Sequence, residues 1–286
     1  MKISGKELAN EIYVDICKKL MILKKHKVIP QLIIVKSSNI DAVNNYIGQK
    51  IKKGEKIGIK VNVLELNEHA CKDKKQIKEK ILQVNKSSKN HGIIFQKPSH
   101  IQINEETEKL INPHKDVDGF LEESFHKPPV YRGVIKVLEK IFAVKKKKLI
   151  SLLKTKKIVL IGKGKTGGQT IISGLKQDGF NMKKLKIIDT QTSKEQKSEY
   201  MENCDIVISA VGKSNPIDFH LFSQKMILID IGVHFDELNK IKGDFDENDI
   251  KERVSYYTTT PGGIGALTVA YLMDNVVNAA KNTITN

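Results

Sequence analysis

Arginine is scarce in this basic chain. Its 286 residues include 49 lysines and arginines against 33 acidic residues, a formal net charge of +16, yet only Arg132 and Arg253 are arginine. Proteins that read nucleic-acid bases favour arginine, because its planar fork can pair with two acceptors at once. The lysines are spread along the chain, with one cluster at 145–148. We therefore interpret the charge as solvated surface, with attraction of an anionic substrate as the alternative, and expect no nucleic-acid partner.

Long apolar runs and closely spaced cysteines are also missing. No apolar run reaches the roughly 18 residues that a membrane span needs. The first twenty residues lack the apolar block of a secretory signal. The cysteines Cys17, Cys71 and Cys204 lie far apart, in no metal-binding spacing, and predict reduced thiols. We expect a protein with no membrane partner and no metal site, located in the cytoplasm or, as the alternative, in an organelle.

Apolar runs alternate with helical patterns, which is typical of parallel βαβ units. The first part of the chain predicts strands at 31–36, 61–66 and 92–96 and helices at 5–25, 42–57 and 74–87. The second part predicts strands at 157–162, 185–189, 204–211 and 226–232 and a helix at 167–179. This alternation predicts an α/β fold with two domains and a cleft between them.

The boundary is expected in 121–130, where two prolines interrupt the pattern. We predict an α/β substrate domain over 1–125 and a Rossmann-like dinucleotide-binding domain over 126–265. The stretch 131–155 resembles a connecting helix followed by a lysine-rich loop. A last helix over 266–286 is expected to pack back on the first domain.

A glycine-rich turn is the most legible motif. Gly162, Gly164 and Gly167 form G-x-G-x-x-G between a predicted strand and a helix, and Gly168 adds room. Such glycines let backbone N–H groups approach a pyrophosphate at a helix N-terminus. Asp189 ends the next predicted strand, where a carboxylate can bind a ribose 2′-hydroxyl. The motif predicts dinucleotide binding, with a simple tight turn as the alternative.

Tyr46 and Lys50 form Y-x-x-x-K on a predicted helix. Their spacing places both on one helical face. A lysine desolvated beside an aromatic ring can lose its proton near neutral pH and take part in proton transfer. The alternative is an ordinary surface helix. Short-chain dehydrogenases use the same spacing, but there it follows the glycine-rich turn, whereas here it precedes it.

Three further segments allow two interpretations each. Asp118 could form a turn, or could bind a ligand edge with two adjacent N–H donors, as pterins present. Gln96, at a strand end, could point into a cleft or cap a loop. Pro261, Gly262 and Gly263 precede the last helix, either as a helix-entry loop or as backbone that passes close to a flat ligand.

Taken in order, these motifs resemble the bifunctional methylenetetrahydrofolate dehydrogenase/methenyltetrahydrofolate cyclohydrolase family over essentially the whole chain. The matching pieces are Y-x-x-x-K at 46–50, Gln96 with Pro98, KDVDGF at 115–120, the turn at 157–168, AVGK at 210–213, IDIGV at 229–233, GD at 243–244 and PGGIG at 261–265. KDVDGF together with PGGIG is specific, whereas the glycine-rich turn is not.

The resemblance implies a pterin ring stacked near Tyr46 and touched by Pro261, Gly262 and Gly263. It implies that Lys50 serves proton transfer and water activation, that Gln96 orients Lys50, and that Asp118 binds the pterin edge. The implied reactions are oxidation of 5,10-methylenetetrahydrofolate to the methenyl compound and its hydrolysis to 10-formyltetrahydrofolate. The implied partners are tetrahydrofolate derivatives, NADP and a second copy of the chain in a homodimer.

Several positions depart from the family pattern. Lys97 stands in place of a leucine, Val43 in place of a serine, and residues 128–131 in place of Pro-Cys-Thr-Pro. These changes leave open whether both half-reactions survive. The alternatives are a shikimate-dehydrogenase-like oxidoreductase and a catalytically degenerate protein that binds folate or a nucleotide.

The expected cofactor pocket departs as well. Lys163 stands where the family has arginine, Asp189 aligns with the family's histidine, and Thr190 follows it. A carboxylate at Asp189 would accept from the ribose hydroxyls of NAD and repel the 2′-phosphate of NADP. Lys165 is close enough in sequence to compensate. The resemblance therefore favours NADP, whereas Asp189 tilts the prediction slightly to NAD.

Overall fold

The computed structural model describes residues 1–66, 73–97, 105–238 and 240–284. Cys71 and Pro98 lie outside the described residues. The chain divides into two compact units: unit 1 comprises Met1–Asn10 and Val130–Thr268, and unit 2 comprises Glu11–Pro129 and Val269–Asn286. Each unit is built around its own parallel sheet, and each is described by itself below.

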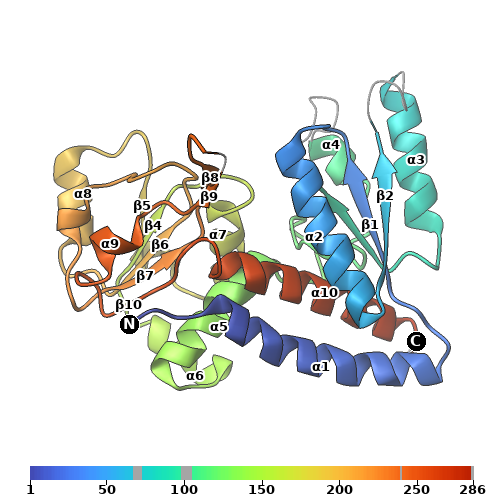
Figure 1. Ribbon diagram of the computed structural model, residues 1–286, viewed down its shortest axis with the longest axis horizontal. Coiled ribbons are helices and arrows are strands. Elements are labelled where there is room, and N and C mark those ends of the chain that lie inside the picture. The colour runs from blue at the N-terminus through green and yellow to red at the C-terminus, as the bar shows by residue number, and fades with distance from the viewer. Residues whose placement is uncertain (67–72, 98–104, 239, 285–286) are drawn as a thin grey trace. The chain divides into compact units, whose positions relative to one another are not determined.

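Unit 2 contains a three-stranded parallel sheet in the order β2-β1-β3. Its strands are β1 (Gln31–Lys36), β2 (Lys60–Glu65) and β3 (Gly92–Phe95). Its complete helices are α2 (Asp41–Ile57), α3 (Lys74–Lys86) and α4 (Glu105–Glu108). Figure 1 shows β1 between its two neighbours. The centre of β1 is buried throughout, as expected for a strand paired on both sides.

Helix α3 packs on this sheet through a short apolar stripe. Ile77 and Ile81, four residues apart, are buried with Ile33, Ile93 and Phe95 in one cluster. The first turn of α3 is capped by the Asp73 carboxylate, which accepts from the backbone N–H of Gln76 at 2.9 Å. Capping and the stripe together define this helix, although its surface is rich in lysine.

Unit 1 contains a five-stranded parallel sheet in the order β10-β7-β6-β4-β5. Its strands are β4 (Ile158–Ile161), β5 (Leu185–Ile188), β6 (Ile206–Ser209), β7 (Ile227–Asp230) and β10 (Tyr256–Tyr257). The first strand, β4, lies between β5 and β6, so the strand order reverses there. In such sheets ligands bind at the carboxyl ends of the strands beside this switch point. The predicted α/β class with a Rossmann-like domain is confirmed.

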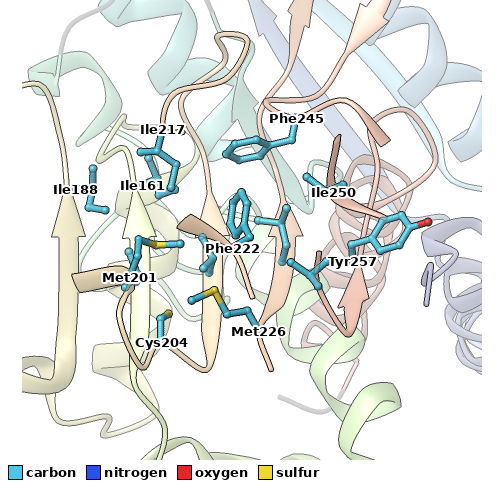
Figure 2. Close-up of a cluster of buried hydrophobic side chains, with 14 residues drawn as sticks. Ile161, Ile188, Met201, Cys204, Ile217, Phe222, Met226, Phe245, Ile250 and Tyr257 are labelled. Carbon is cyan, nitrogen blue, oxygen red and sulfur yellow. The ribbon is translucent and has the colours of Figure 1, made fainter. Parts of the chain in front are cut away.

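One face of the unit 1 sheet carries a continuous apolar core, shown in Figure 2. Ile161 and Leu228 of the sheet are buried against Met201, Phe222 and other apolar side chains that cover this face. The rings of Phe222 and Phe245 meet edge to face, with centroids 5.1 Å apart. This core supports the strand ends from which the loops described below emerge.

The remaining helices and the small hairpin complete the fold. The helices are α1 (Gly5–Lys25), α5 (Pro129–Phe142), α6 (Lys146–Leu153), α7 (Gly168–Gln177), α8 (Lys194–Met201), α9 (Glu247–Ile250) and α10 (Ile264–Asn282), with 3-10 turns η1 (Met182–Lys184) and η2 (Phe219–Leu221). The hairpin pairs β8 (His234–Phe235) with β9 (Ile241–Lys242). Among the described residues, no helix combines the length and apolar character needed to cross a membrane.

Two segments behave differently from their sequence patterns. The lysine-rich loop predicted after the connecting helix is wrong, because helix α6 begins within the lysine cluster. Leu149 and Leu153 lie one turn apart and are both buried, whereas Lys147 and Lys148 are exposed to solvent. Helix α8 has almost no apolar stripe, but a capping box formed by Ser193 and Gln196 defines its start.

Candidate active site

Lys50 and Gln96 meet in unit 2. Lys50 lies one turn after Tyr46 on α2, and Gln96 directly follows β3. The Lys50 Nζ donates to Gln96 Oε1 at 2.8 Å, and Gln96 Nε2 donates to the Lys97 carbonyl at 2.8 Å. Because the second bond holds the amide by its nitrogen, the Gln96 oxygen faces the lysine. The structure thus brings together two residues that are distant in sequence.

Burial changes the protonation of this group. Lys50 and Asp118 each retain some accessible surface but are surrounded by protein atoms, and their charges interact. Burial lowers the pKa of the Lys50 ammonium, although the nearby Asp118 charge opposes this effect. Burial raises the pKa of Asp118 to about 6, against the effect of Lys50 and with help from Asp116 and Glu108. The amine is therefore easier to deprotonate than an ordinary lysine.

Tyr46 lies on the same face of α2 and is partly exposed. Burial raises the pKa of its phenol, so the hydroxyl stays protonated at neutral pH. The helix is held by Val43 and Ile47, which are buried on its inner side. Tyr46 therefore offers a neutral aromatic surface one turn from the amine.

The loop that carries Asp118 is fixed by its neighbour Asp116, to which sequence reasoning gave no role. The buried Asp116 carboxylate accepts from the backbone N–H groups of Gly119 at 3.1 Å and Leu121 at 2.8 Å. Gly119 has a φ of +67°, and a side chain there would collide with the His126 carbonyl. Asp116 and Gly119 therefore set the backbone that presents Asp118.

Asn275 holds the same loop from α10. Its Nδ2 donates to the carbonyl of Val117 at 2.8 Å and to that of Lys127 at 3.0 Å, and the residue is buried. Sequence reasoning missed Asn275, although the polar pair Asp274 and Asn275 among buried apolar residues of the last helix was an available signal. The bond to Val117 fixes the residue immediately before Asp118.

Lys97, which departs from the family pattern, has a counter-charge. Its ammonium forms an ion pair with Glu108, a buried carboxylate of α4. Glu108 is also one of the charges that raise the pKa of Asp118. The departure at Lys97 therefore partly neutralises an acidic neighbour of the Lys50 group.

In unit 1, the glycine-rich turn lies at the carboxyl end of β4. Gly162 has a φ of +86°, and its N–H donates to the Ile188 carbonyl at 2.8 Å. Gly168 begins α7, and a side chain there would overlap the Gly162 carbonyl. At Gly164, no described heavy atom lies within 4 Å of the position that a Cβ would take. An open backbone turn before a helix N-terminus fits a pyrophosphate.

Asp189 follows β5 and is already paired. Its Oδ2 lies 2.7 Å from Lys163 Nζ, and its Oδ1 accepts from the backbone N–H of Gln191 at 2.9 Å and from Thr192 Oγ1 at 3.2 Å. The hydrogen bond from Lys163 is the main cause that lowers the pKa of Asp189. Thr190 is exposed at the same turn. The predicted pocket residues Lys163 and Asp189 thus form one ion pair.

Pro261, Gly262 and Gly263 also belong to unit 1 and lead into α10. Gly262 has a φ of +100°, and its carbonyl accepts from the Lys6 backbone N–H at 3.2 Å. At Gly263, a side chain would meet the Thr259 carbonyl. The segment is therefore a tight helix-entry loop whose glycines are required by its backbone.

Comparison with protein families covers nearly the whole chain. Residues 3–118 match the catalytic domain of tetrahydrofolate dehydrogenase/cyclohydrolase, and residues 131–284 match the NAD(P)-binding domain of the same family. The bifunctional protein FolD of Rickettsia canadensis is 31% identical over 98% of this chain and 96% of its own length. FolD of Bacillus licheniformis is 31% identical over 99% of this chain and 98% of its own length.

Solved structures agree with this assignment. The bifunctional methylenetetrahydrofolate dehydrogenase/cyclohydrolase FolD of Campylobacter jejuni superposes with a TM-score of 0.86 and 28% identity, over 99% of both chains. The Trypanosoma brucei enzyme, solved with NADP and an inhibitor, shares the fold at 20% identity, with a TM-score of 0.85 over 100% of this chain and 99% of its own.

The two family domains follow each other in this chain as the motifs predicted. The predicted enzyme class and the need for a nicotinamide dinucleotide are confirmed, and the shikimate-dehydrogenase-like alternative is not favoured. The chain belongs to the tetrahydrofolate dehydrogenase/cyclohydrolase family.

Proposed function

We propose that this chain oxidises 5,10-methylenetetrahydrofolate to 5,10-methenyltetrahydrofolate and hydrolyses that product to 10-formyltetrahydrofolate, with Lys50 as the proton-transfer group. The family match over both domains supports the reaction class. The observation that carries the role of Lys50 is its 2.8 Å hydrogen bond to Gln96 in a setting that lowers the lysine pKa.

Hydrolysis needs one group that takes a proton and returns it. Neutral Lys50 accepts a proton from water as the water oxygen bonds to the electrophilic methenyl carbon. When one carbon–nitrogen bond then breaks, the Lys50 ammonium returns a proton to the leaving nitrogen. The hydroxyl group of the adduct loses its proton to solvent as the formyl C=O forms, so hydrolysis releases one proton overall. Gln96 accepts a hydrogen bond from Lys50 in either protonation state, so it keeps the amine oriented through both steps.

Tyr46 and Asp118 bind the pterin in this proposal. The exposed part of the Tyr46 ring offers a stacking surface, and ionised Asp118 accepts from two adjacent N–H donors of the pterin edge. The buried positions of Asp116 and Asn275 support this role, because they hold the Asp118 backbone in one conformation.

The dinucleotide binds at the glycine-rich turn from Gly162 to Gly168, with its pyrophosphate at the start of α7. When bound, the dinucleotide would supply the acceptor for the hydride that leaves the methylene carbon. We infer that NAD is preferred over NADP. To bind a 2′-phosphate, Lys163 would have to turn away from Asp189, and the unpaired carboxylate would then face a dianion.

The test uses purified protein with 5,10-methylenetetrahydrofolate and either NAD or NADP. Absorbance reports the reduced dinucleotide, and a second assay follows hydrolysis of added methenyl compound. We expect both reactions. Tight folate binding without either reaction would show a degenerate binding protein instead.

A homodimer and a cytoplasmic location are further proposals from the family resemblance and from composition. Sedimentation of the purified protein would give twice the chain mass of 32.2 kDa if the dimer forms. A single-chain mass at working concentration would contradict it.

A further inference from the structure

Asp244 is a fully buried carboxylate in unit 1 that belongs to the GD motif. Its Oδ2 accepts from Ser209 Oγ at 2.5 Å and from the Val211 backbone N–H at 2.9 Å. Its Oδ1 accepts from the backbone N–H groups of Gly212 at 2.8 Å and Lys213 at 3.2 Å. One side chain therefore binds the end of β6 and three consecutive residues of the loop that follows it.

This loop, residues 210–213, lies at the switch point of the sheet. It leaves the carboxyl end of β6, which is paired with β4, and the glycine-rich turn leaves the carboxyl end of β4. A dinucleotide in such a fold lies across the strand ends at this position. The loop held by Asp244 is thus a neighbour of the proposed pyrophosphate site.

Ala210 joins the loop to the glycine-rich turn. Its backbone N–H donates to the Ile161 carbonyl at 2.8 Å. A Cβ on Gly162 would lie 2.8 Å from the Ala210 carbonyl oxygen, and one on Gly167 would lie 3.0 Å from the Ala210 Cβ. Contact this close leaves little room, so a shift of the loop displaces the turn.

Asp244 is itself held by a reciprocal arrangement with Asp230, which ends β7. Asp230 accepts from the backbone N–H groups of Gly232 at 3.0 Å and Phe245 at 3.2 Å. A side chain at Gly232 would overlap the Asp244 carboxylate, and one at Gly243 would overlap the Asp230 carboxylate. Each aspartate therefore occupies the space above a glycine in the other's segment, which explains why both motifs pair Asp with Gly.

We propose that Asp244 is a positioning residue of the dinucleotide site, which fixes the 210–213 loop and, through Ala210, the glycine-rich turn. The inference rests on the proposed dinucleotide binding at that turn. Asp244 does not touch the ligand in this account. Its loss should therefore weaken dinucleotide binding while the chemistry at saturating dinucleotide is largely retained.

The test compares full-length wild-type protein with Asp244→Asn and with the matched control Asp230→Asn. Both variants replace a buried carboxylate of the same pair, but the Asp230 carboxylate accepts from the backbone of Gly232 and Phe245, whereas Asp244 accepts from the 210–213 loop. An asparagine at 244 turns an amide nitrogen toward at least one N–H donor that it cannot bind. We expect the KM and Kd for the dinucleotide to rise about tenfold in Asp244→Asn, with a smaller change in kcat.

The dinucleotide Kd values of these variants decide the inference. An equal rise in the dinucleotide Kd for both variants would overturn the inference, because Asp244 would then contribute only to the stability of the fold. An unchanged Kd in Asp244→Asn would overturn it as well. If Asp244→Asn does not fold, Ser209→Ala removes one of the four donors, and a rise of about threefold supports the inference whereas no change contradicts it. Failure of the wild type to bind any dinucleotide would instead contradict the proposed function.

Discussion

The Lys50–Asp118 pair of unit 2 and the Asp230–Asp244 pair of unit 1 both place carboxyl groups among protein atoms. The two pairs differ in the partners that these carboxyl groups have. Asp118 interacts with a lysine and keeps some accessible surface. Asp230 and Asp244 are buried, and their oxygens accept from backbone N–H groups and one serine. Neither forms an ion pair within the part of the chain that the structure describes.

The difference separates groups that can react from groups that hold structure. Lys50 and Asp118 keep some accessible surface, where a ligand can form hydrogen bonds with them. Burial lowers the pKa of Lys50 and raises that of Asp118, which favours the neutral form of each. The oxygens of Asp244 already accept from four donors of their own unit. Burial and the Asp244 charge raise the pKa of Asp230, although its oxygens already accept from Gly232 and Phe245. A raised pKa therefore does not by itself mark a catalytic group in this protein, and the remaining accessible surface must be considered with it.

The largest effect is expected at the reactive group. Lys50→Met should lower methenyl hydrolysis by about 10²–10⁴-fold, because it removes the proton-transfer amine. The matched control is Lys52→Met, which removes an exposed lysine from the same helix and should hydrolyse at the wild-type rate. Equal rates in both variants would remove Lys50 from its proposed role.

The next prediction concerns the buried carboxyl group of Asp230 and the pH dependence of stability. Burial and the Asp244 charge raise the pKa of Asp230 to about 7, far above its value in the unfolded chain. The folded state therefore retains a proton that the unfolded state releases, and stability falls as pH rises from about 4 to 7. The slope from this group approaches 1.4 kcal/mol per pH unit. Asp230→Asn should lack this part of the slope in unfolding measured by denaturant, and identical slopes would show that Asp230 does not titrate there.

A smaller loss is expected for Asp118→Asn. A charge-assisted pair with the pterin edge becomes a neutral and partly mismatched one, so the folate Kd should rise about 10- to 100-fold while the dinucleotide Kd stays constant. In the wild type, folate affinity should also fall as pH drops through about 6, since protonation removes the accepting charge. Calorimetric titration of both ligands checks this. Equal losses for both ligands would assign Asp118 to the turn alone.

The smallest effect concerns cofactor choice. Asp189→Ala frees Lys163 for a 2′-phosphate, so the ratio of kcat/KM for NADP to that for NAD should rise by several fold, about 10-fold at most. Steady-state kinetics with both dinucleotides measures the ratio. An NADP preference already present in the wild type and unchanged in the variant would show that the carboxylate does not reach the ribose.

Local patterns predicted the parallel strands except the two-residue β10, and most of the long helices, because apolar periodicity reports burial directly. The apolar pattern did not predict α6, because the run of lysines at 145–148 precedes the buried residues Leu149 and Leu153. The relation between Lys50 and Gln96 came from family resemblance. Spacing alone cannot bring together residues that the chain separates by two strands and one helix.

The structural carboxylates were harder to predict than the reactive ones. Asp230 and Asp244 each stand near a glycine, which in sequence is typical of an ordinary turn. Their reciprocal packing depends on two loops that meet only in the folded unit. Asn275 is polar within an apolar helix, but its partners are backbone carbonyls, so the side-chain pattern does not indicate what it binds.

The pH–rate profile of methenyl hydrolysis, corrected for the uncatalysed reaction, is the most direct test of neutral Lys50 as the proton acceptor. If neutral Lys50 is the base, kcat must rise with pH through an ionisation below the ordinary lysine pKa, because only the unprotonated amine accepts the proton from water. We predict that this rise is present in the wild type and absent from the residual activity of Lys50→Met. The same rise in both proteins would contradict it.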